Sequence, residues 1–320
     1  MFRWFARLLA LGLLVLAVPG QAQTLAAINA SRHVDCGVVQ GVDDWNGEDV
    51  HGNLSALGGE ICRAVAVTIL GGSEALKAGK IQLAVGISPS ATVAVQFGLS
   101  FGPPVFYYSQ RVLVAKQSGV TSLAGLRDQV ICALDMSPPE RTLRDELTSR
   151  HIAYALMSHS EQGELDAAVA VRRCAATGME SRLAQSRANF HARTSDFVFL
   201  PERLALAPVV PAYPDNDRTF GRIVDWTIGA LIEAEALGIT KANVIEAGKR
   251  EDMRAGQLLG HDFTAGQALG LTHDWATKVI AATGNYGEIF ARTTGEPYQL
   301  ERGLNALWTQ GGLMTAMPMN

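Results

Sequence analysis

An early strand–helix–strand pattern constrains the fold of this 320-residue chain more than any other feature. Residues 34–39 form a short apolar run, and residues 60–70 then carry apolar side chains at helical spacing until Gly71 ends the pattern. Residues 81–85 alternate as a strand does. A strand, a helix and a second strand in this order predict a parallel sheet flanked by helices.

The middle of the chain predicts a second unit of the same class. Residues 130–134 and 197–200 are short, continuously apolar runs, which is typical of strands buried on both faces. Between them, Pro138 and Pro139 can open a helix, because a missing backbone donor costs nothing in the first turn. We therefore expect a second α/β lobe.

Two extended crossings are expected to join the lobes, near residues 108–116 and 207–213. Pro208 and Pro211 keep the second crossing from turning helical. The chain then divides into a first part of lobe 1 at 24–109, lobe 2 at 110–209, and a return to lobe 1 with a C-terminal helical extension at 210–320.

The return to lobe 1 is predicted to be helical. Residues 217–237 place apolar side chains along one stripe, and Gly238 follows as a stop signal. Helical patterning recurs at residues 276–282 and 303–310. These helices are expected to thicken lobe 1.

Residues 1–23 have the pattern of a secretory signal peptide. Arg3 and Arg7 precede an apolar run over residues 8–18, and small residues follow before the expected cut. The run is shorter than the about 20 residues that a membrane-spanning helix needs. We expect an exported, soluble chain without a lipid anchor, since no cysteine stands at the cut.

Charge and motif content disfavour several classes of function. The formal net charge of −4 offers no basic footprint, so no nucleic acid partner is expected. The sequence has no His-Glu-x-x-His helix and no phosphate-binding loop. Its seven histidines and four cysteines lack the short spacings of a zinc site. We expect no enzyme, no catalytic residue, no metal and no cofactor.

Several short sequence motifs in the last third of the chain resemble those of a known family. Residues 284–290 read GNYGEIF, residues 302–308 read RGLNALW and residues 311–314 read GGLM. Together with DWT at 225–227 and CGV at 36–38, they resemble the periplasmic substrate-binding proteins of general L-amino-acid ABC transporters, which are family 3 solute-binding proteins.

The resemblance implies an α/β fold of the periplasmic-binding-protein type II class. Two α/β lobes are joined by two hinge crossings, with an extended helical C-terminal region. It further implies a periplasmic receptor that closes on an amino acid or a related small polar or cationic solute between its lobes. The implied partner is an inner-membrane ABC permease, and a monomer is expected.

Four cysteines remain in an exported chain, and an even number in that compartment is typically paired. Three connectivities are open. We favour Cys36–Cys62 and Cys132–Cys174, because each pair then lies inside one lobe of the implied fold. Unpaired core cysteines are the alternative.

The positions where relatives hold the ligand carboxylate are altered in lobe 1. The strand at 81–85 leads in relatives to a polar loop and then to an arginine that grips the carboxylate. Here the loop offers the hydroxyls of Ser88, Ser90 and Thr92, which we predict to bind ligand, and the arginine position falls at Val93 or Ala94. The arginine clamp is missing.

Lobe 2 differs as well. Relatives place a run of hydroxyl residues at a helix start that meets the same carboxylate. This chain keeps Ser137 and Glu140, which we predict to line the site, but Pro138 and Pro139 remove two backbone donors, so anion binding there should be weak. Arg111 can replace the lost arginine, or it can be a solvated hinge charge.

Four further residues are predicted to contact ligand. Glu180 aligns with the acid that pairs with the ligand ammonium in relatives, although it can also be a solvated loop residue. Tyr108 precedes the first crossing. Asp44 and Trp45 lie on an early acidic loop, where the indole can stack on a ligand. This loop lacks the distant glutamate of a calcium site, so an acidic turn is favoured over calcium binding.

The function that follows is a solute receptor of an ABC importer. The alternative on the same fold is a degenerate accessory protein that binds a partner and takes no part in transport. Permease and ATPase genes beside this one would favour the receptor, since a receptor needs a pump to which it can deliver its ligand.

Overall fold

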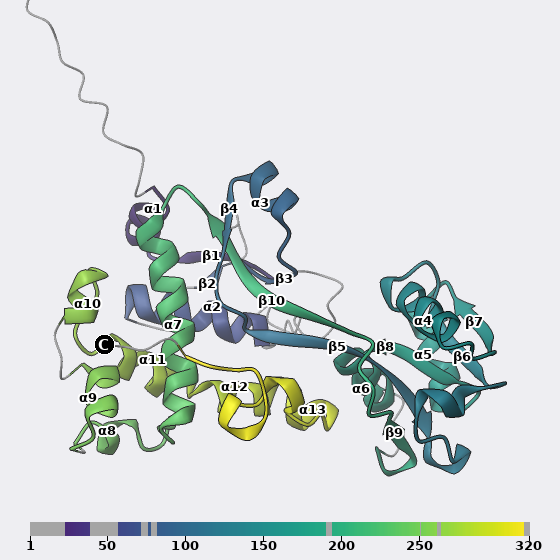
Figure 1. Ribbon diagram of the computed structural model, residues 1–320. Helices are drawn as coiled ribbons and strands as arrows, with labels where there is room; N and C mark the ends of the chain where they lie inside the picture. The colour runs from purple at the N-terminus through teal and green to yellow at the C-terminus, as the bar shows by residue number, and fades with distance from the viewer. Residues whose placement is uncertain are drawn as a thin grey trace, which may run out of the picture.

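The computed structural model describes residues 23–38, 57–71, 76–77, 82–189, 194–249, 251–260 and 264–316 (Figure 1). The expected signal peptide and the loop with Asp44 and Trp45 lie outside the described residues. Among the helices described, none combines the length and apolar character needed to cross a membrane.

The elements follow the predicted strand and helix order closely. The strands are β1 (Val34–Val38), β2 (Leu76–Lys77), β3 (Leu83–Ile87), β4 (Leu99–Phe101), β5 (Phe106–Ala115), β6 (Val130–Leu134), β7 (Ala155–His159), β8 (Ala175–Met179), β9 (Phe197–Phe199) and β10 (Ala205–Pro214). The helices are α1 (Gln23–Ser31), α2 (Leu57–Leu70), α3 (Ala91–Phe97), α4 (Pro138–Ser149), α5 (Gln162–Ala170), α6 (Glu180–Asn189), α7 (Arg218–Ala236), α8 (Val244–Ala247), α9 (Met253–Leu259), α10 (Thr264–Ala268), α11 (Trp275–Thr283), α12 (Tyr286–Phe290) and α13 (Glu296–Tyr298).

The strands form a continuous path in the order β2-β1-β3-β10-β5-β8-β6-β7, and this path joins two parallel blocks. In one block β1 runs parallel to β2 and β3, and in the other β6 runs parallel to β7 and β8. The antiparallel pair β5 and β10 lies between the blocks. The parallel α/β class predicted from the strand–helix–strand pattern is confirmed.

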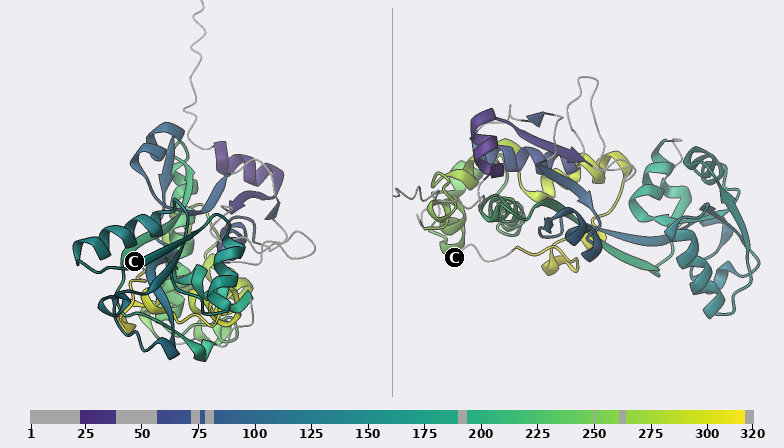
Figure 2. Two further views of the ribbon diagram at one scale, coloured as in Figure 1. Left: turned by 90° about the vertical axis from the view of Figure 1, so that its right-hand side faces the viewer. Right: turned by 90° about the horizontal axis from the view of Figure 1, so that it is seen from above.

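Two bodies lie at opposite ends of the β5 and β10 strands (Figures 1 and 2). Lobe 1 denotes β1–β4, α1–α3 and α7–α13, and lobe 2 denotes β6–β9 and α4–α6. Lobe 1 has a single large hydrophobic cluster, whereas the second body has two clusters on either side of its sheet strands. The exact division of the chain at 109/110 and 209/210, which falls within β5 and β10, stays a prediction.

Both crossings are long strands, as predicted. Strand β10 carries Pro208 opposite Tyr107 of β5, and its register against β3 shifts between Val210 and Pro211. Proline cannot donate to a ladder, so an irregular strand is where it can be accommodated. The two crossings are paired with each other along only part of their length, between Phe106 and Gln110 of β5.

One disulfide lies within each lobe, with the predicted connectivity. Cys36 of β1 is bonded to Cys62 of α2, with their Cα atoms 6.2 Å apart. Cys132 of β6 is bonded to Cys174, just before β8, at a Cα separation of 5.7 Å. Each bridge joins a sheet strand to a neighbouring element of the same core.

The C-terminal region is largely helical, with one correction. Helix α7 begins after Asp217, whose carboxylate accepts the N–H of Phe220 at 2.9 Å, and it ends before Gly238 at a φ of +64°. The prediction of a helix at residues 303–310 is wrong. Two short 3₁₀ turns stand there, because the extended backbones of Ala306 and Leu307, with ψ of 162° and 149°, separate them.

Candidate functional site

A pocket of about 310 Å³ lies where the two lobes meet. Ser88 reaches it from the end of β3, Tyr108 from strand β5, and Ser137 from the start of α4. The sequence predicted all three as ligand contacts, and the fold brings them together from separate segments. The remaining lining comes from lobe 2, so lobe 1 leaves the pocket open on its own side.

The start of α4 forms the polar rim of this pocket. Ser137 caps the helix by accepting the N–H of Glu140 at 3.2 Å, and its carbonyl accepts the N–H of Arg141. Pro138 and Pro139 occupy the two positions between and have no N–H. The first turn therefore presents no free backbone donor, which agrees with the expectation of weak anion binding there.

Glu140 is turned into its own helix start. Its carboxylate is 4% exposed and accepts the Met136 N–H at 2.7 Å and the Arg144 guanidinium at 2.7 Å. A serine and a glutamate in this arrangement accept hydrogen bonds from backbone N–H groups at a helix start, which have no partner within the helix. These contacts give Glu140 a structural task, and it is not among the residues that line the pocket.

Ser90 and Thr92 lie on α3, outside the pocket lining. Ser90 caps this helix, accepting the N–H of Val93 at 3.5 Å, and Thr92 is exposed one residue before. Val93 and Ala94, where relatives were expected to place an arginine, belong to the same short helix. Ligand contacts of Ser90 and Thr92 stay predictions.

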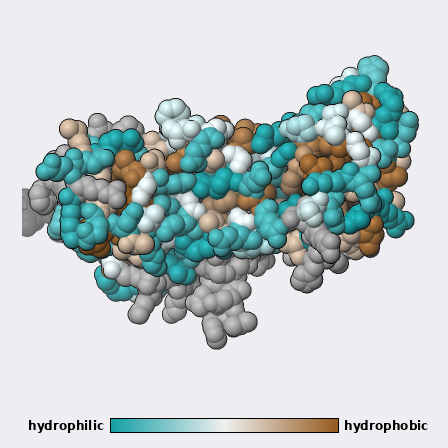
Figure 3. Space-filling view, turned by 90° about the horizontal axis from the view of Figure 1, so that it is seen from below, coloured by the Kyte–Doolittle hydropathy of each residue, from teal (hydrophilic) through white to brown (hydrophobic). Residues whose placement is uncertain are grey.

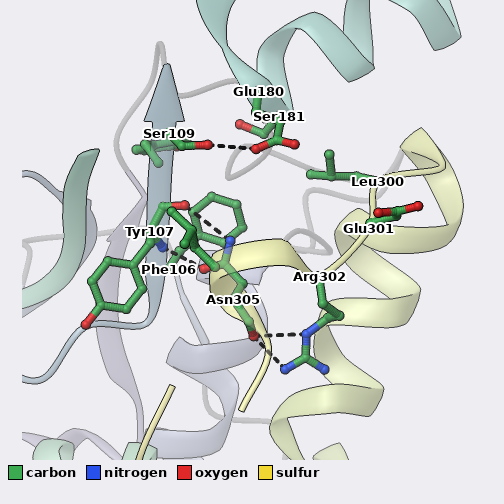
Figure 4. A pocket seen from close by; sticks show the side chains of 11 residues that line it. Phe106, Tyr107, Ser109, Glu180, Ser181, Leu300, Glu301, Arg302 and Asn305 are labelled. Atoms are coloured by element: carbon green, nitrogen blue, oxygen red, sulfur yellow. Dashed lines mark hydrogen bonds between the residues drawn. The ribbon is translucent and has the colours of Figure 1, made fainter. Parts of the chain in front are cut away.

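Glu180 is the first residue of α6 and points toward the crossing strand β5. One carboxylate oxygen pairs with Arg111 at 2.6 Å, and the other accepts the Ser109 hydroxyl at 2.7 Å (Figure 4). Arg111 also donates to the Leu200 carbonyl at 2.6 Å and lies over the Phe199 ring. Arg111 is only 15% exposed, so the expectation of a solvated hinge charge is wrong.

A second, much smaller pocket contains Glu180. It holds about 10 Å³, roughly one water, between β5, the start of α6 and residues 300–305 (Figure 4). Tyr108 and Ser181 line both pockets, so the two are adjacent. The predicted ammonium contact of Glu180 is not tested by this geometry and stays a prediction.

A buried polar network under the larger pocket was missed by sequence reasoning. Arg182 lines the pocket and donates to Asp166 at 3.0 Å, and Asp166 is 3% exposed. Gln162 and Ser186 donate to the other oxygen of Asp166 at 2.8 and 2.6 Å. The spacing of four within each helix was readable, but the contact between α5 and α6 was not.

The electrostatics of the larger pocket are simple. Arg182 is the only ionisable cation among the described lining residues, and no carboxylate lines the pocket directly. Asp166 beneath offsets the guanidinium charge. Leu134, Leu165 and Met179 give the pocket an apolar wall. Such a site suits a small solute with one polar end and an apolar or neutral body.

Residues 98–102 read GLSFG, which fits the letters of a nucleophile elbow. Ser100, however, lies inside β4 opposite Tyr213 of β10, whereas that motif needs a strand-to-helix turn. Gly102 serves close packing, since a Cβ there would lie 2.6 Å from Asp225 Oδ1.

Comparison with known proteins gives a consistent result, although no protein-family model matches the chain. The chain is 33% identical to the general L-amino acid-binding periplasmic protein AapJ of Rhizobium johnstonii over 97% of both chains. It is 32% identical to the glutamate/glutamine/aspartate/asparagine-binding protein BztA of Rhodobacter capsulatus over 95% of both.

A solved structure agrees with these relatives. A periplasmic binding protein of an ABC transporter from Brucella ovis, with glutathione bound, matches with a TM-score of 0.77 and 30% identity. The match covers 93% of this chain and 99% of that one. These relatives are binding proteins, and the resemblance inferred from the sequence words is confirmed. The chain belongs to the family of periplasmic amino-acid-binding proteins of ABC transporters.

Proposed function

We propose that this chain is a periplasmic receptor of an ABC importer that binds an amino acid or a related small polar solute between its lobes. The observation that carries the proposal is the pocket of about 310 Å³ lined by Ser88, the crossing residue Tyr108 and the start of α4. Its volume lies at the lower end of the range typical of small-molecule sites. The liganded form would be read by an inner-membrane permease.

Arg182 is the group best suited to a ligand carboxylate in this pocket. The arginine clamp that relatives carry on lobe 1 is missing from the sequence, the α4 start has no free backbone donor, and Arg111, which Glu180 and Leu200 hold, does not line the pocket as Arg182 does. Ser88, Ser137 and Gln162 add hydrogen-bonding groups around it. Closure of lobe 1 would bring Ser90 and Thr92 of α3 toward the same solute.

The proposal is tested with the mature protein after unfolding, washing and refolding to remove carried-over ligand. Thermal shift against amino acids, glutathione, polyamines and small organic acids finds candidates, because ligands of the folded state raise the Tm. Calorimetry then gives the Kd. We expect saturable binding of a solute with a carboxylate. Binding of polyamines alone would assign the site to Glu180, and no binding would favour the accessory, non-transport role.

A further inference from the structure

The lobes are joined by a third connection besides β5 and β10. Residues 296–305, called the C-terminal clasp here, belong to lobe 1 but lie against α6 of lobe 2. Figure 1 shows α13, which begins the clasp, next to α6 beneath the crossing strands. Figure 3 shows the molecule from below, with hydrophilic residues over much of this face and hydrophobic patches between them. The clasp therefore spans the two bodies that must move if the pocket closes.

On the lobe 2 side the clasp is held mainly by Arg187. The Arg187 Nη2 donates to the carbonyls of Tyr298 at 3.2 Å and Gln299 at 3.3 Å. Two residues earlier on α6, Gln185 donates to the Tyr298 hydroxyl at 3.3 Å. Arg187 is 5% exposed, and its guanidinium lies 6.0 Å from the Phe199 ring centre.

On the lobe 1 side the clasp is fixed more firmly. Arg302 makes a two-point contact with Glu235 of α7, at 2.9 and 3.1 Å, and stacks over Phe290. The Asn305 side chain bonds both backbone groups of Tyr107, at 2.6 Å to the N–H and 3.2 Å to the carbonyl (Figure 4). A paired guanidinium and a paired amide anchor the clasp at the base of β5.

The contrast between the two ends shows which one can release. Arg187 uses only Nη2 toward the clasp, and its Nε has no hydrogen-bond partner among the described residues. Burial lowers the pKa of Arg187 from its ordinary value, which is the sign of an incompletely compensated charge. This contact exists while the pocket is open, since Ser88, which directly follows β3, is the one described lining residue that comes from lobe 1.

We propose that the C-terminal clasp, through Arg187, holds the ligand-free receptor open and so lowers its apparent affinity. The inference rests on the proposed receptor function, because it assigns a regulating contact to that same pocket. Arg187 is then a positioning residue: it touches no ligand, and it acts through the balance of open and closed forms. A ligand must release the Arg187 contact as it closes the lobes, and the fraction of closed protein scales the observed Kd.

The test measures the lobe distance without ligand. The four native cysteines are all bonded, so spin labels at Gln96→Cys on α3 and Asp145→Cys on α4 report the distance across the pocket. Arg187→Met should add a population at shorter distance in ligand-free protein. For a solute that binds wild type, the Kd of the Arg187→Met variant should be about three- to tenfold lower than that of wild type. Arg254→Met removes an arginine paired within lobe 1 and should change neither quantity.

Tyr298→Phe supplies a milder second variant. It deletes only the hydroxyl that Gln185 contacts, so it keeps the fold if Arg187→Met does not, and it should shift the distance in the same direction by less. An unchanged ligand-free distance in the folded variants overturns the clasp, as does a weaker affinity at shorter distance. If wild type binds no solute, the receptor function fails, while the ligand-free distances still decide the clasp.

Discussion

Arg111 and Glu180 form an ion pair of 2.6 Å between strand β5 and the first residue of α6, with only 15% and 19% of their side chains exposed. The pair joins the crossing to lobe 2 at the edge of the pocket. The uncharged Ser109 hydroxyl donates a hydrogen bond to the second carboxylate oxygen of Glu180. The carboxylate that was expected to meet a ligand ammonium is thus already compensated by the protein.

Breaking this pair should cost stability. Arg111→Met leaves Glu180 with the Ser109 hydroxyl alone, and leaving a buried carboxylate without its cation costs about 3–5 kcal/mol. Urea unfolding of Arg111→Met, Glu180→Gln and the double variant checks this. The double variant should lose less free energy of unfolding than the two single variants lose together. Strict additivity would contradict the pair.

Arg182 should decide the charge of the ligand. Arg182→Gln removes a charge-assisted hydrogen bond to a carboxylate, worth about 1.5–3 kcal/mol, or roughly ten- to a hundredfold in Kd. Arg150→Gln, at the exposed residue that follows α4, is the matched control and should bind as wild type does. Calorimetry with an anionic solute and with a neutral analogue distinguishes a role of Arg182 in ligand binding from a role in folding. Equal losses for both solutes would assign Arg182 to folding alone.

Each disulfide should stabilise its own lobe. The bridges close segments with sequence separations of 26 and 42 residues, for which chain entropy predicts about 3–4 kcal/mol each. Replacing Cys132 and Cys174 by alanine should lower the unfolding midpoint of lobe 2 more than that of lobe 1. Hydrogen exchange that follows β6 and β2 separately shows which lobe loosens. Uniform loosening of both would argue against independent cores.

Acidification should affect the Tyr213–Asp225 contact in a defined direction. The Tyr213 hydroxyl donates to Asp225 at 2.8 Å, and burial raises the pKa of Asp225 above its ordinary value. A raised carboxyl pKa means that the folded state binds the proton more readily than the unfolded state. The contribution of this group therefore improves as pH falls toward the ordinary range near 3.8 and weakens as pH rises through the folded pKa.

Asp225→Asn tests that sign, because asparagine keeps the shape and does not titrate. The Tm of wild type minus the Tm of the variant should increase between pH 7 and 4, measured by calorimetric scans. Wild type should gain on the variant as the pH falls. A wild type that loses ground to the variant on acidification would show that Asp225 is stabilised as the charged form.

Much of the fold could be predicted because its signals are local. Local residues alone predict the strand at 130–134, the helix α4 that begins at two prolines, and the helix end at Gly238. The disulfides followed once the two lobes were inferred. The prediction for residues 303–310 failed because the helical spacing of their apolar side chains does not encode the extended backbone at Ala306 and Leu307.

The site was less predictable, because its contacts depend on side chains from distant elements. Ser88, Tyr108 and Ser137 reached the pocket since strand ends and helix starts of such a sheet converge. Glu140 did not, because its own helix start needed the carboxylate. The pairings of Glu180 with Arg111, 69 residues apart, and of Arg182 with Asp166 depend on packing that spacing alone does not encode.

Asn305 has a consequence beyond the hinge. Strand β5 pairs with β10 along one side from Phe106, but along the other side β8 joins it only from Gln110. The peptide of Tyr107 would otherwise present an unpaired donor and acceptor, the kind of sheet margin onto which a foreign strand can add. The Asn305 amide fills both positions. A side chain thus stands in for a missing strand, and the Tyr107 peptide keeps no free donor or acceptor with which a foreign strand could pair.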